Sequence, residues 1–342
     1  MISVETLLRD SADRTHLAVH RTHCVEPPRE LDVVGGSDHF PPLTGVDTIV
    51  SLVDVTDPRY SLRNRYLVDP RLRVVYEEGE VQSFAFRRLS MVPLETPTRI
   101  RGTVACLAQE MNYGHWLLLA LPFIRLYREY LGGDPDYYYL GSRVQTYHVQ
   151  TLELMGIPET KILRHAVSAD RLLVAVADRR AGYDTDFLLY PDEALLPELQ
   201  PPASPRRRIF VSRARNPRRR IVNESECARA LEDLGVELVA TETLSMSDEV
   251  ALFRETELVV GADGAGMVNC VFMPPGGTVV ELFSRTYYYP QIPELAAVKG
   301  HRYGLLFGEP AARQLGIRGY DHDFSVDVDR LTALVRSALG GS

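Results

Sequence analysis

A glycine-rich turn at residues 261–266 is the clearest candidate for binding chemistry in this sequence. The chain reads LVVGADGAGMVN over residues 258–269, so an apolar strand breaks into three glycines within six residues and resumes as a helix. Glycine lets the backbone approach a ligand closely, and the free N–H groups at a helix start favour an anion such as a diphosphate. A turn that is glycine-rich only for tight packing would show the same pattern. Whether this turn binds a ligand therefore has to be judged from other residues.

Two charged residues in the same half of the chain favour the binding interpretation. Arg213 follows the apolar strand 208–212, where a guanidinium could form a bidentate contact with a phosphate. The rest of the arginine-rich run 206–220 is typical of a solvated loop. Glu281 lies inside the apolar strand 278–283, where a carboxylate is costly unless it is paired or bound to ligand hydroxyls. Ribose hydroxyls would suit it, and a salt bridge to an arginine is the structural alternative.

A second candidate group lies in the first half of the chain. The segment EMNYGHWLLLALPFIRL places Glu110, Asn112 and His115 around the start of a helix, beside the only tryptophan. The positive end of the helix dipole would favour a neutral His115 imidazole that can accept a proton. A structural histidine, hydrogen-bonded in the core, is the alternative, and residue type alone favours it.

The elements that must position these residues are most regular in the second half. Short apolar strands alternate there with amphipathic helices, which predicts a parallel sheet with helices on both faces. Ligands bind outside the carboxyl ends of such strands, where the 261–266 turn and Arg213 fall. A last amphipathic stretch, 328–339, could cross back onto the first domain. We expect strands at 208–212, 236–240, 258–261 and 278–283, and helices at 224–234, 247–255 and 264–273.

The first half is less regular, and residues 1–100 match no functional pattern. Proline-rich turns there separate short alternating runs. The pattern of strands and helices becomes clearer after residue 102. Gly156 can provide a left-handed cap at the end of the helix expected at 144–155. We expect strands at 47–53, 71–76, 103–107 and 137–140, and helices at 113–131 and 144–155.

Length and composition favour a two-domain α/β protein. A chain of 342 residues is longer than a single hydrophobic core usually supports. The proline-rich segment 196–208 is the best candidate for a linker, which predicts domains 1–198 and 199–342. The net charge of −8 argues against a nucleic-acid partner. Four separated cysteines without C-x-x-C spacing indicate reduced thiols, and no apolar run approaches the ~18 residues of a membrane span. We therefore expect a cytoplasmic protein, with any membrane contact peripheral.

Taken together, the motifs resemble those of glycosyltransferase family 61 over roughly residues 101–283. Their order and spacing make the resemblance fairly specific. The matching positions are Asn112, His115, Trp116 and Pro122 for N-x-x-H-W and the following helix, Ser212 and Arg213 for S-R, Asn223 and Glu224 for the N-E helix start, and the segments 261–269 and 272–281 for G-x-H-G-A-G-L-x-N and F-x-P-P-G-x-x-V-x-E.

The resemblance implies a GT-B-like architecture, in which two Rossmann-like domains face each other across a cleft. It also implies inverting transfer of a sugar from a nucleoside diphosphate sugar to a hydroxyl acceptor such as a glycan, in polysaccharide or glycoconjugate biosynthesis. Members transfer xylose, arabinose or N-acetylglucosamine, and bacterial look-alikes are often labelled capsular polysaccharide biosynthesis proteins. The matching segments have no D-x-D metal motif, which indicates a metal-independent enzyme with the sugar nucleotide as co-substrate and no other cofactor.

The same resemblance gives candidate roles to individual residues. His115 is the expected general base, with Glu110 as second choice. One position departs from the family: Asp263 stands where the family usually has histidine, and an ionised carboxylate would repel a diphosphate unless an arginine screens it. Asp263 could instead turn away, bind a sugar hydroxyl, or mark lost donor binding. The residues expected to bind the donor are Arg213, Asn223, Asp263, Gly264, Ala265, Gly266, Asn269 and Glu281, and plain helix capping is the alternative for Asn223.

Two other classes of function stay open. A non-catalytic nucleotide-sugar-binding protein is credible because of Asp263. A nicotinamide or flavin oxidoreductase is disfavoured, because the glycine turn follows the third strand of its half and no acidic residue ends the next strand as the dinucleotide fingerprint requires. The donor sugar, nucleotide base, acceptor, linkage and oligomeric state do not follow from the sequence.

Overall fold

The chain folds into two units, each with its own sheets, and each is described here by itself. Unit 1 comprises residues 1–26 and 45–190, and unit 2 comprises residues 27–44 and 191–342. The segment 27–44, which the sequence places in the first domain, thus belongs to the second unit, and the division falls at 190/191 where 198/199 was expected. The computed structural model describes residues 2–3, 16–25, 32–39, 47–72, 74–76, 95–108, 111–177, 185–197, 199, 202, 204–286, 288–311 and 321–340.

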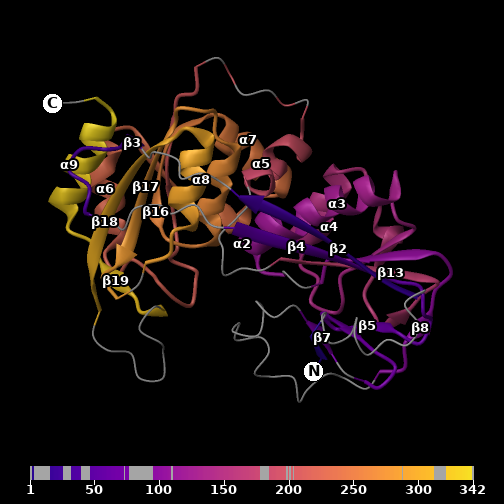
Figure 1. Cartoon of the computed structure of the whole chain (residues 1–342). Coiled ribbons are helices and arrows are strands. Elements are labelled where there is room, and N and C mark those ends of the chain that lie inside the picture. Colours follow the sequence, from indigo (N-terminus) through magenta and orange to yellow (C-terminus); the bar gives the residue numbers. More distant parts are fainter. Residues whose placement is uncertain are drawn as a thin grey trace. The chain divides into compact units, whose positions relative to one another are not determined.

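Unit 2 is built on one predominantly parallel sheet, as the alternating pattern predicts (Figure 1). All its strand pairs are parallel except the pair of the last two strands, β18 and β19. A two-residue strand from residues 27–44 pairs with β18. The strands in spatial order are β15 (Val236–Val239), β14 (Arg207–Val211), β16 (Thr256–Ala262), β17 (Thr278–Ser284), β18 (Arg302–Pro310) and β19 (Phe324–Ser325), with β3 (Asp32–Val33) beside β18.

Helices cover both faces of this sheet. The α-helices are α6 (Glu224–Glu232), α7 (Met246–Arg254), α8 (Gln291–Lys299) and α9 (Val328–Ala338). In Figure 1, α6 and α9 lie on one side of β16–β18, and α7 and α8 lie on the other. The helical segment after Gly264 is the 3-10 helix η8 (Ala265–Phe272), shorter and tighter than the helix expected at 264–273.

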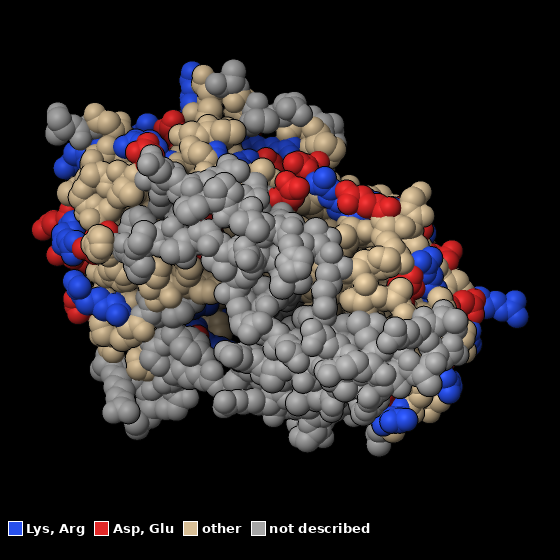
Figure 2. Space-filling view, viewed as in Figure 1, with Lys and Arg blue, Asp and Glu red and all other residues tan. Residues whose placement is uncertain are grey.

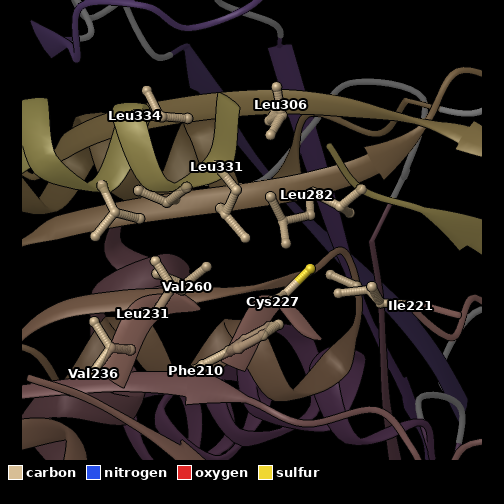
Figure 3. Close-up of a cluster of buried hydrophobic side chains, with 14 of the residues drawn as sticks. Phe210, Ile221, Cys227, Leu231, Val236, Val260, Leu282, Leu306, Leu331 and Leu334 are labelled. Atoms are coloured by element: carbon tan, nitrogen blue, oxygen red, sulfur yellow. The ribbon is translucent and has the colours of Figure 1, made fainter. Parts of the chain in front are cut away.

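One hydrophobic core of unit 2 lies between the sheet and the α6/α9 pair. Figure 3 shows Cys227 and Leu231 of α6 and Leu331 and Leu334 of α9 packed over side chains of the central strands. Helix α9 therefore belongs to unit 2, where its apolar face completes the core, and does not cross back onto the first domain. The strand residues of this face recur with a period of two, as expected for a sheet covered by helices: Phe210, Leu258, Val260, Ala262, Val280, Leu282 and Leu306.

Unit 1 contains a mixed sheet of six strands. Four of its strands run parallel to their neighbours, and two long antiparallel strands complete one side. The spatial order is β11 (Ile162–Leu163), β10 (Tyr137–Tyr139), β9 (Thr103–Cys106), β13 (Arg171–Ala177), β4 (Asp47–Val55) and β2 (Leu17–Val25).

Two smaller sheets complete the strands of unit 1. A four-stranded sheet contains β6 (Tyr66–Val68), β5 (Ser61–Arg63), β12 (Val167–Ser168) and β8 (Thr98–Arg99), and β1 (Ile2–Ser3) pairs with β7 (Val75–Tyr76). The strand expected at 71–76 is thus reduced to β7, because Leu72 has a left-handed backbone in the preceding turn, with a φ of 60°.

The helix expected at 113–131 is interrupted by a wide turn. It divides into α2 (Tyr113–His115), the π-helix η4 (Trp116–Ala120) and α3 (Leu121–Leu131). Single π-turns inside helices are frequent at functional sites. The other helices of this region are α4 (Thr146–Leu154), the 3-10 helix η5 (Glu159–Lys161) and α5 (Thr185–Ala194), which runs across the division between the units.

Surface charge and thiol state agree with the composition. On the face shown in Figure 2, acidic and basic side chains are interspersed over the described surface. Cys106, Cys227 and Cys270 are buried free thiols, as expected, and the side chain of Cys24 lies outside the described residues. None of the described helices is both long enough and apolar enough to cross a membrane.

Candidate functional site

The carboxyl ends of the parallel strands bring three predicted site elements of unit 2 together. In register, Val211 of β14 pairs with Gly261 of β16, and Gly261 pairs with Glu281 of β17. Arg213 lies just beyond β14, and the 261–266 turn begins at the end of β16. Because parallel strands all end at one edge, Arg213, the turn and Glu281 meet there, as the sequence pattern predicts.

Gly264 is the point where the turn and Arg213 touch. A Cβ at Gly264 would lie 1.8 Å from Nη1 of Arg213, and the φ of Gly264 is 156°. A side chain there would therefore displace the guanidinium. Gly261 is a packing glycine instead, because its Cβ would lie 2.5 Å from Sδ of Met267. The turn is thus tightly packed at Gly261, as the structural alternative predicts, and lies against Arg213 at Gly264.

Arg213 is a buried cation with incomplete hydrogen bonding. Its backbone N–H donates to Oε2 of Glu224 at 2.8 Å, and Ser212 Oγ donates to Oε1 of the same carboxylate at 2.6 Å. The guanidinium donates to the Arg218 carbonyl at 3.3 Å, whereas Nε has no hydrogen-bond partner among the described residues. Burial, followed by the charge of Arg219, lowers the pKa of Arg213 to about 10, so it remains charged at neutral pH. A buried donor without a partner suits an anion.

Asp263 is screened by an arginine that the sequence analysis assigned to a solvated loop. Its carboxylate pairs with the Arg219 guanidinium, and both side chains are largely buried. Arg219 has a left-handed backbone, with a φ of 53°, and such strain in a non-glycine residue is often found at functional sites. The three consecutive arginines of this loop each pair with an aspartate: Arg218 with Asp321, Arg219 with Asp263 and Arg220 with Asp323.

Glu281 is a buried carboxyl next to Asp263, and its partner is a tyrosine. The side chain is fully buried, and its Oε2 accepts a hydrogen bond from Tyr303 Oη at 2.8 Å. Burial raises the pKa of Glu281 well above its usual range, and the Asp263 carboxylate raises it further. Burial also raises the pKa of Asp263, while Arg219 and Arg213 oppose that rise. A proton held by the pair therefore resides on Glu281, because no arginine contact of similar strength opposes the rise there.

Asn223 and Asn269 have structural partners where donor contacts were expected. The Asn223 amide donates to the Val326 carbonyl at 2.8 Å and accepts from the Val326 N–H at 3.0 Å, which ties the start of α6 to the segment before α9. It makes no side-chain cap either. Asn269 is fully buried, and its Nδ2 donates to Oε2 of Glu249 at 2.9 Å, which joins η8 to α7.

The predicted catalytic residues belong to unit 1. Glu110 lies outside the described residues. His115 is half-buried at the end of α2, whose N-cap Asn112 accepts a hydrogen bond from the Gly114 N–H at 3.2 Å. The next residue, Trp116, is fully buried and donates from Nε1 to Thr151 Oγ1 at 2.8 Å. His115 is thus at the border of the core, immediately before the π-turn.

Three buried groups near these sites were missed at the sequence level: Arg219, Tyr303 and His148. The His148 ring packs edge-on against Trp116, with centroids 4.5 Å apart, and its Nδ1 accepts from the Gln145 N–H at 2.7 Å. Burial lowers the pKa of His148 to about 4, so its imidazole is neutral. Nothing in the local sequence around His148 or Tyr303 signals these roles, because both depend on contacts made in the folded chain.

Comparison with known proteins agrees with the α/β fold and with the motifs that form this site. Mixed α/β units with parallel sheets are consistent with a glycosyltransferase. Residues 113–280 match the family model described as Glycosyltransferase 61. This stretch of the chain therefore belongs to the glycosyltransferase 61 family, and it includes both His115 and the 261–266 turn.

Two curated relatives show the same kinship over shorter stretches. The chain is 31% identical over 88 residues to the EGF domain-specific O-linked N-acetylglucosamine transferase of Drosophila melanogaster, covering 25% of this chain and 17% of the relative. It is 28% identical over 136 residues to the alpha-1,3-arabinosyltransferase XAT2 of Oryza sativa subsp. japonica, covering 39% of this chain and 21% of the relative. The matches thus span about a fifth of the length of these relatives.

Proposed function

We propose that this protein is an inverting glycosyltransferase that binds a nucleoside diphosphate sugar in unit 2 and transfers the sugar to a hydroxyl acceptor. The observation that carries the proposal is the buried Arg213 guanidinium lying against Gly264 at the carboxyl edge of a parallel sheet. The relatives' names mention N-acetylglucosamine and arabinose, so both sugars are candidates for the donor. A GT-B-like arrangement of the two units, and a role in polysaccharide or glycoconjugate synthesis, belong to the same proposal.

In this mechanism Arg213 and the turn stabilise the departing diphosphate. Negative charge develops on the leaving phosphate as the bond to the anomeric carbon breaks, and fixed donors aimed at that charge lower the barrier. Arg213 and the backbone N–H groups after Gly264 would supply this stabilisation without a metal ion. The described residues contain no group of three or more His, Cys, Asp or Glu side chains arranged to hold a metal.

His115 is our proposed general base, with Glu110 as the second choice. The base takes the proton of the acceptor hydroxyl while its oxygen attacks the anomeric carbon from the face opposite the diphosphate, which inverts the configuration. A general base typically contributes a factor of about 10² to 10⁴ in rate, so His115→Ala should lose most turnover and retain donor binding.

Donor binding is tested by screening nucleoside diphosphate sugars for protection against thermal unfolding, followed by calorimetry. A ligand raises stability by RT ln(1 + [L]/Kd), so binding donors are recognised without knowing the acceptor. Arg213→Gln should lower the affinity for the donors that bind. The matched control Arg215→Gln, at an exposed position of the same loop, should leave that affinity unchanged. Equal affinities in both variants would remove Arg213 from the site.

The alternative of nucleotide-sugar binding without catalysis rests on Asp263, which already pairs with an arginine next to the turn. One assay distinguishes a glycosyltransferase from a protein that only binds the nucleotide sugar. A catalyst releases free nucleoside diphosphate from a bound donor when an acceptor or water is present, whereas a pure binding protein returns the donor intact.

A further inference from the structure

The charges around the 261–266 turn sum to one net positive charge before any diphosphate arrives. Two guanidinium groups, Arg213 and Arg219, face one carboxylate, Asp263, and burial favours the protonated form of the neighbouring Glu281. A diphosphate diester brings two negative charges. With Asp263 still ionised, three negative charges would face two cations in a largely buried site, which is costly at low effective dielectric constant.

The geometry of Glu281 shows where a proton can be held. Its Oε2 accepts from Tyr303 Oη at 2.8 Å, whereas its Oε1 has no hydrogen-bond donor among the described residues and is fully buried. The group next to it is the Asp263 carboxyl. Two ionised carboxylates cannot hydrogen-bond each other, so the contact is satisfied only when the pair carries a proton.

We propose that the diphosphate of the donor binds together with one proton, which the Asp263–Glu281 pair takes up as Arg219 exchanges Asp263 for a phosphate oxygen. This inference rests on the proposed function, because it concerns the same site. After the exchange both carboxyls are neutral, and two guanidinium groups face two phosphate charges. Asp263 thereby becomes compatible with the ligand that its ionised form would repel.

The other charged and titratable groups facing the pair do not provide this proton. Arg213 and Arg219 both come from the β14–α6 connection, and the pKa of Arg213, lowered by burial to about 10, leaves that group cationic near neutral pH. Burial raises the pKa of Tyr303 on β18, of Tyr288 after β17 and of Cys270 on η8, so these groups stay neutral. The charges of Glu224 and Glu242 favour the cationic form of Arg213.

Proton uptake has a measurable consequence for affinity. When one proton enters with the ligand, the binding constant falls by up to about tenfold per pH unit, over the range where the free protein lacks that proton and the complex holds it. Donor binding should therefore weaken as the pH rises through neutrality. The diphosphate diester of a sugar nucleotide has no proton to exchange in this range, unlike the terminal phosphate of free UDP, so the linkage reports on the protein.

The test is calorimetry of the full chain with sugar nucleotides. The probes are UDP-N-acetylglucosamine, UDP-arabinose, GDP-mannose, ADP-glucose and dTDP-glucose, each titrated in two buffers of different ionisation enthalpy. For a probe that binds, we expect the heat difference to correspond to about one proton taken up per ligand. Asp263→Asn should show no uptake and a flat pH profile, and its affinity should exceed that of the wild type near pH 8.

Asp321→Asn is the matched control, because Asp321 pairs with the neighbouring Arg218 at 2.9 Å, as Asp263 pairs with Arg219. It should keep the wild-type proton uptake. Wild-type binding without proton exchange would overturn the inference and leave the proposed function intact, and this measurement needs no variant to fold. An Asp263→Asn protein that binds UDP normally but loses the sugar nucleotide would also overturn it, because Asp263 would then be a sugar ligand. If no probe bound to the wild type or to Asp263→Asn, both the inference and the proposed function would fail.

Discussion

Replacing Gly264 by alanine tests the central contact of the site. The new Cβ would lie 1.8 Å from Nη1 of Arg213, and ordinary contact begins at 3.4 Å, so the guanidinium would have to retreat by about 1.6 Å (3.4 − 1.8). Hydrogen bonds between charged groups contribute about 1.5 to 3 kcal/mol, so misplacing this cation should weaken donor binding by roughly 10- to 150-fold. The assay is calorimetry with whichever sugar nucleotide the wild type binds.

Gly276→Ala provides the matched control for backbone strain. Gly276 also has a positive φ, of 82°, but an added Cβ there would meet nothing within 4 Å. Its variant should lose about 1 to 2 kcal/mol of unfolding free energy through the left-handed backbone and keep wild-type donor affinity. The reasoning is refuted if Gly264→Ala binds the donor as tightly as Gly276→Ala does, because a displaced Arg213 would then be irrelevant to binding.

Three further predictions concern buried polar groups. Tyr303→Phe removes the hydroxyl that donates to the fully buried Glu281 carboxyl and should cost about 1 to 3 kcal/mol in urea unfolding; an unchanged stability would contradict the role of this hydrogen bond. Asn269→Leu leaves the buried Glu249 carboxylate without its amide partner, so it should lower the free energy of unfolding by about 1 to 3 kcal/mol and leave donor affinity unchanged. Weaker donor binding in the folded variant would show that Asn269 contributes to the donor site. Burial gives His148 a pKa of about 4 in the folded chain, against about 6.5 in the unfolded chain. The folding stability that the neutral imidazole contributes is therefore fully present above about pH 6.5 and is lost as the pH falls toward 4, at up to ~1.4 kcal/mol per pH unit. His148→Asn should flatten that part of the curve of stability against pH, and an unchanged slope would contradict the lowered pKa.

The second half of the chain was predictable because its local patterns and its tertiary contacts agree. Short apolar strands, helix starts and glycine turns each indicate the same parallel sheet, and the strand ends then fix the edge where Arg213 and Gly264 meet. The β3 strand was not predictable. It has two residues, Asp32 and Val33, and its pairing with β18 depends on a contact between segments far apart in sequence.

The roles of individual polar residues were harder to predict than the fold. Arg219 belongs to an arginine run that resembles a solvated loop, and only the folded chain shows its pairing with Asp263. Asn223 and Asn269 match the family pattern by type, but an amide can bind a ligand or join two elements, and its partner decides which. Residue type gives the available chemistry, whereas tertiary contacts decide where it is used.

The short β3 strand also bears on how the C-terminal half can be handled in isolation. Residues 32–39 protect one side of β18: Val34 donates to the Tyr303 carbonyl at 2.8 Å, and Asp38 accepts from the Phe307 N–H at 2.8 Å and pairs with Arg330. A fragment beginning at residue 191 would leave this strand edge unpaired, and exposed edges promote aggregation. A stable isolated unit 2 should therefore be a permuted protein in which residues 27–44 are joined to 191–342, and not a simple truncation.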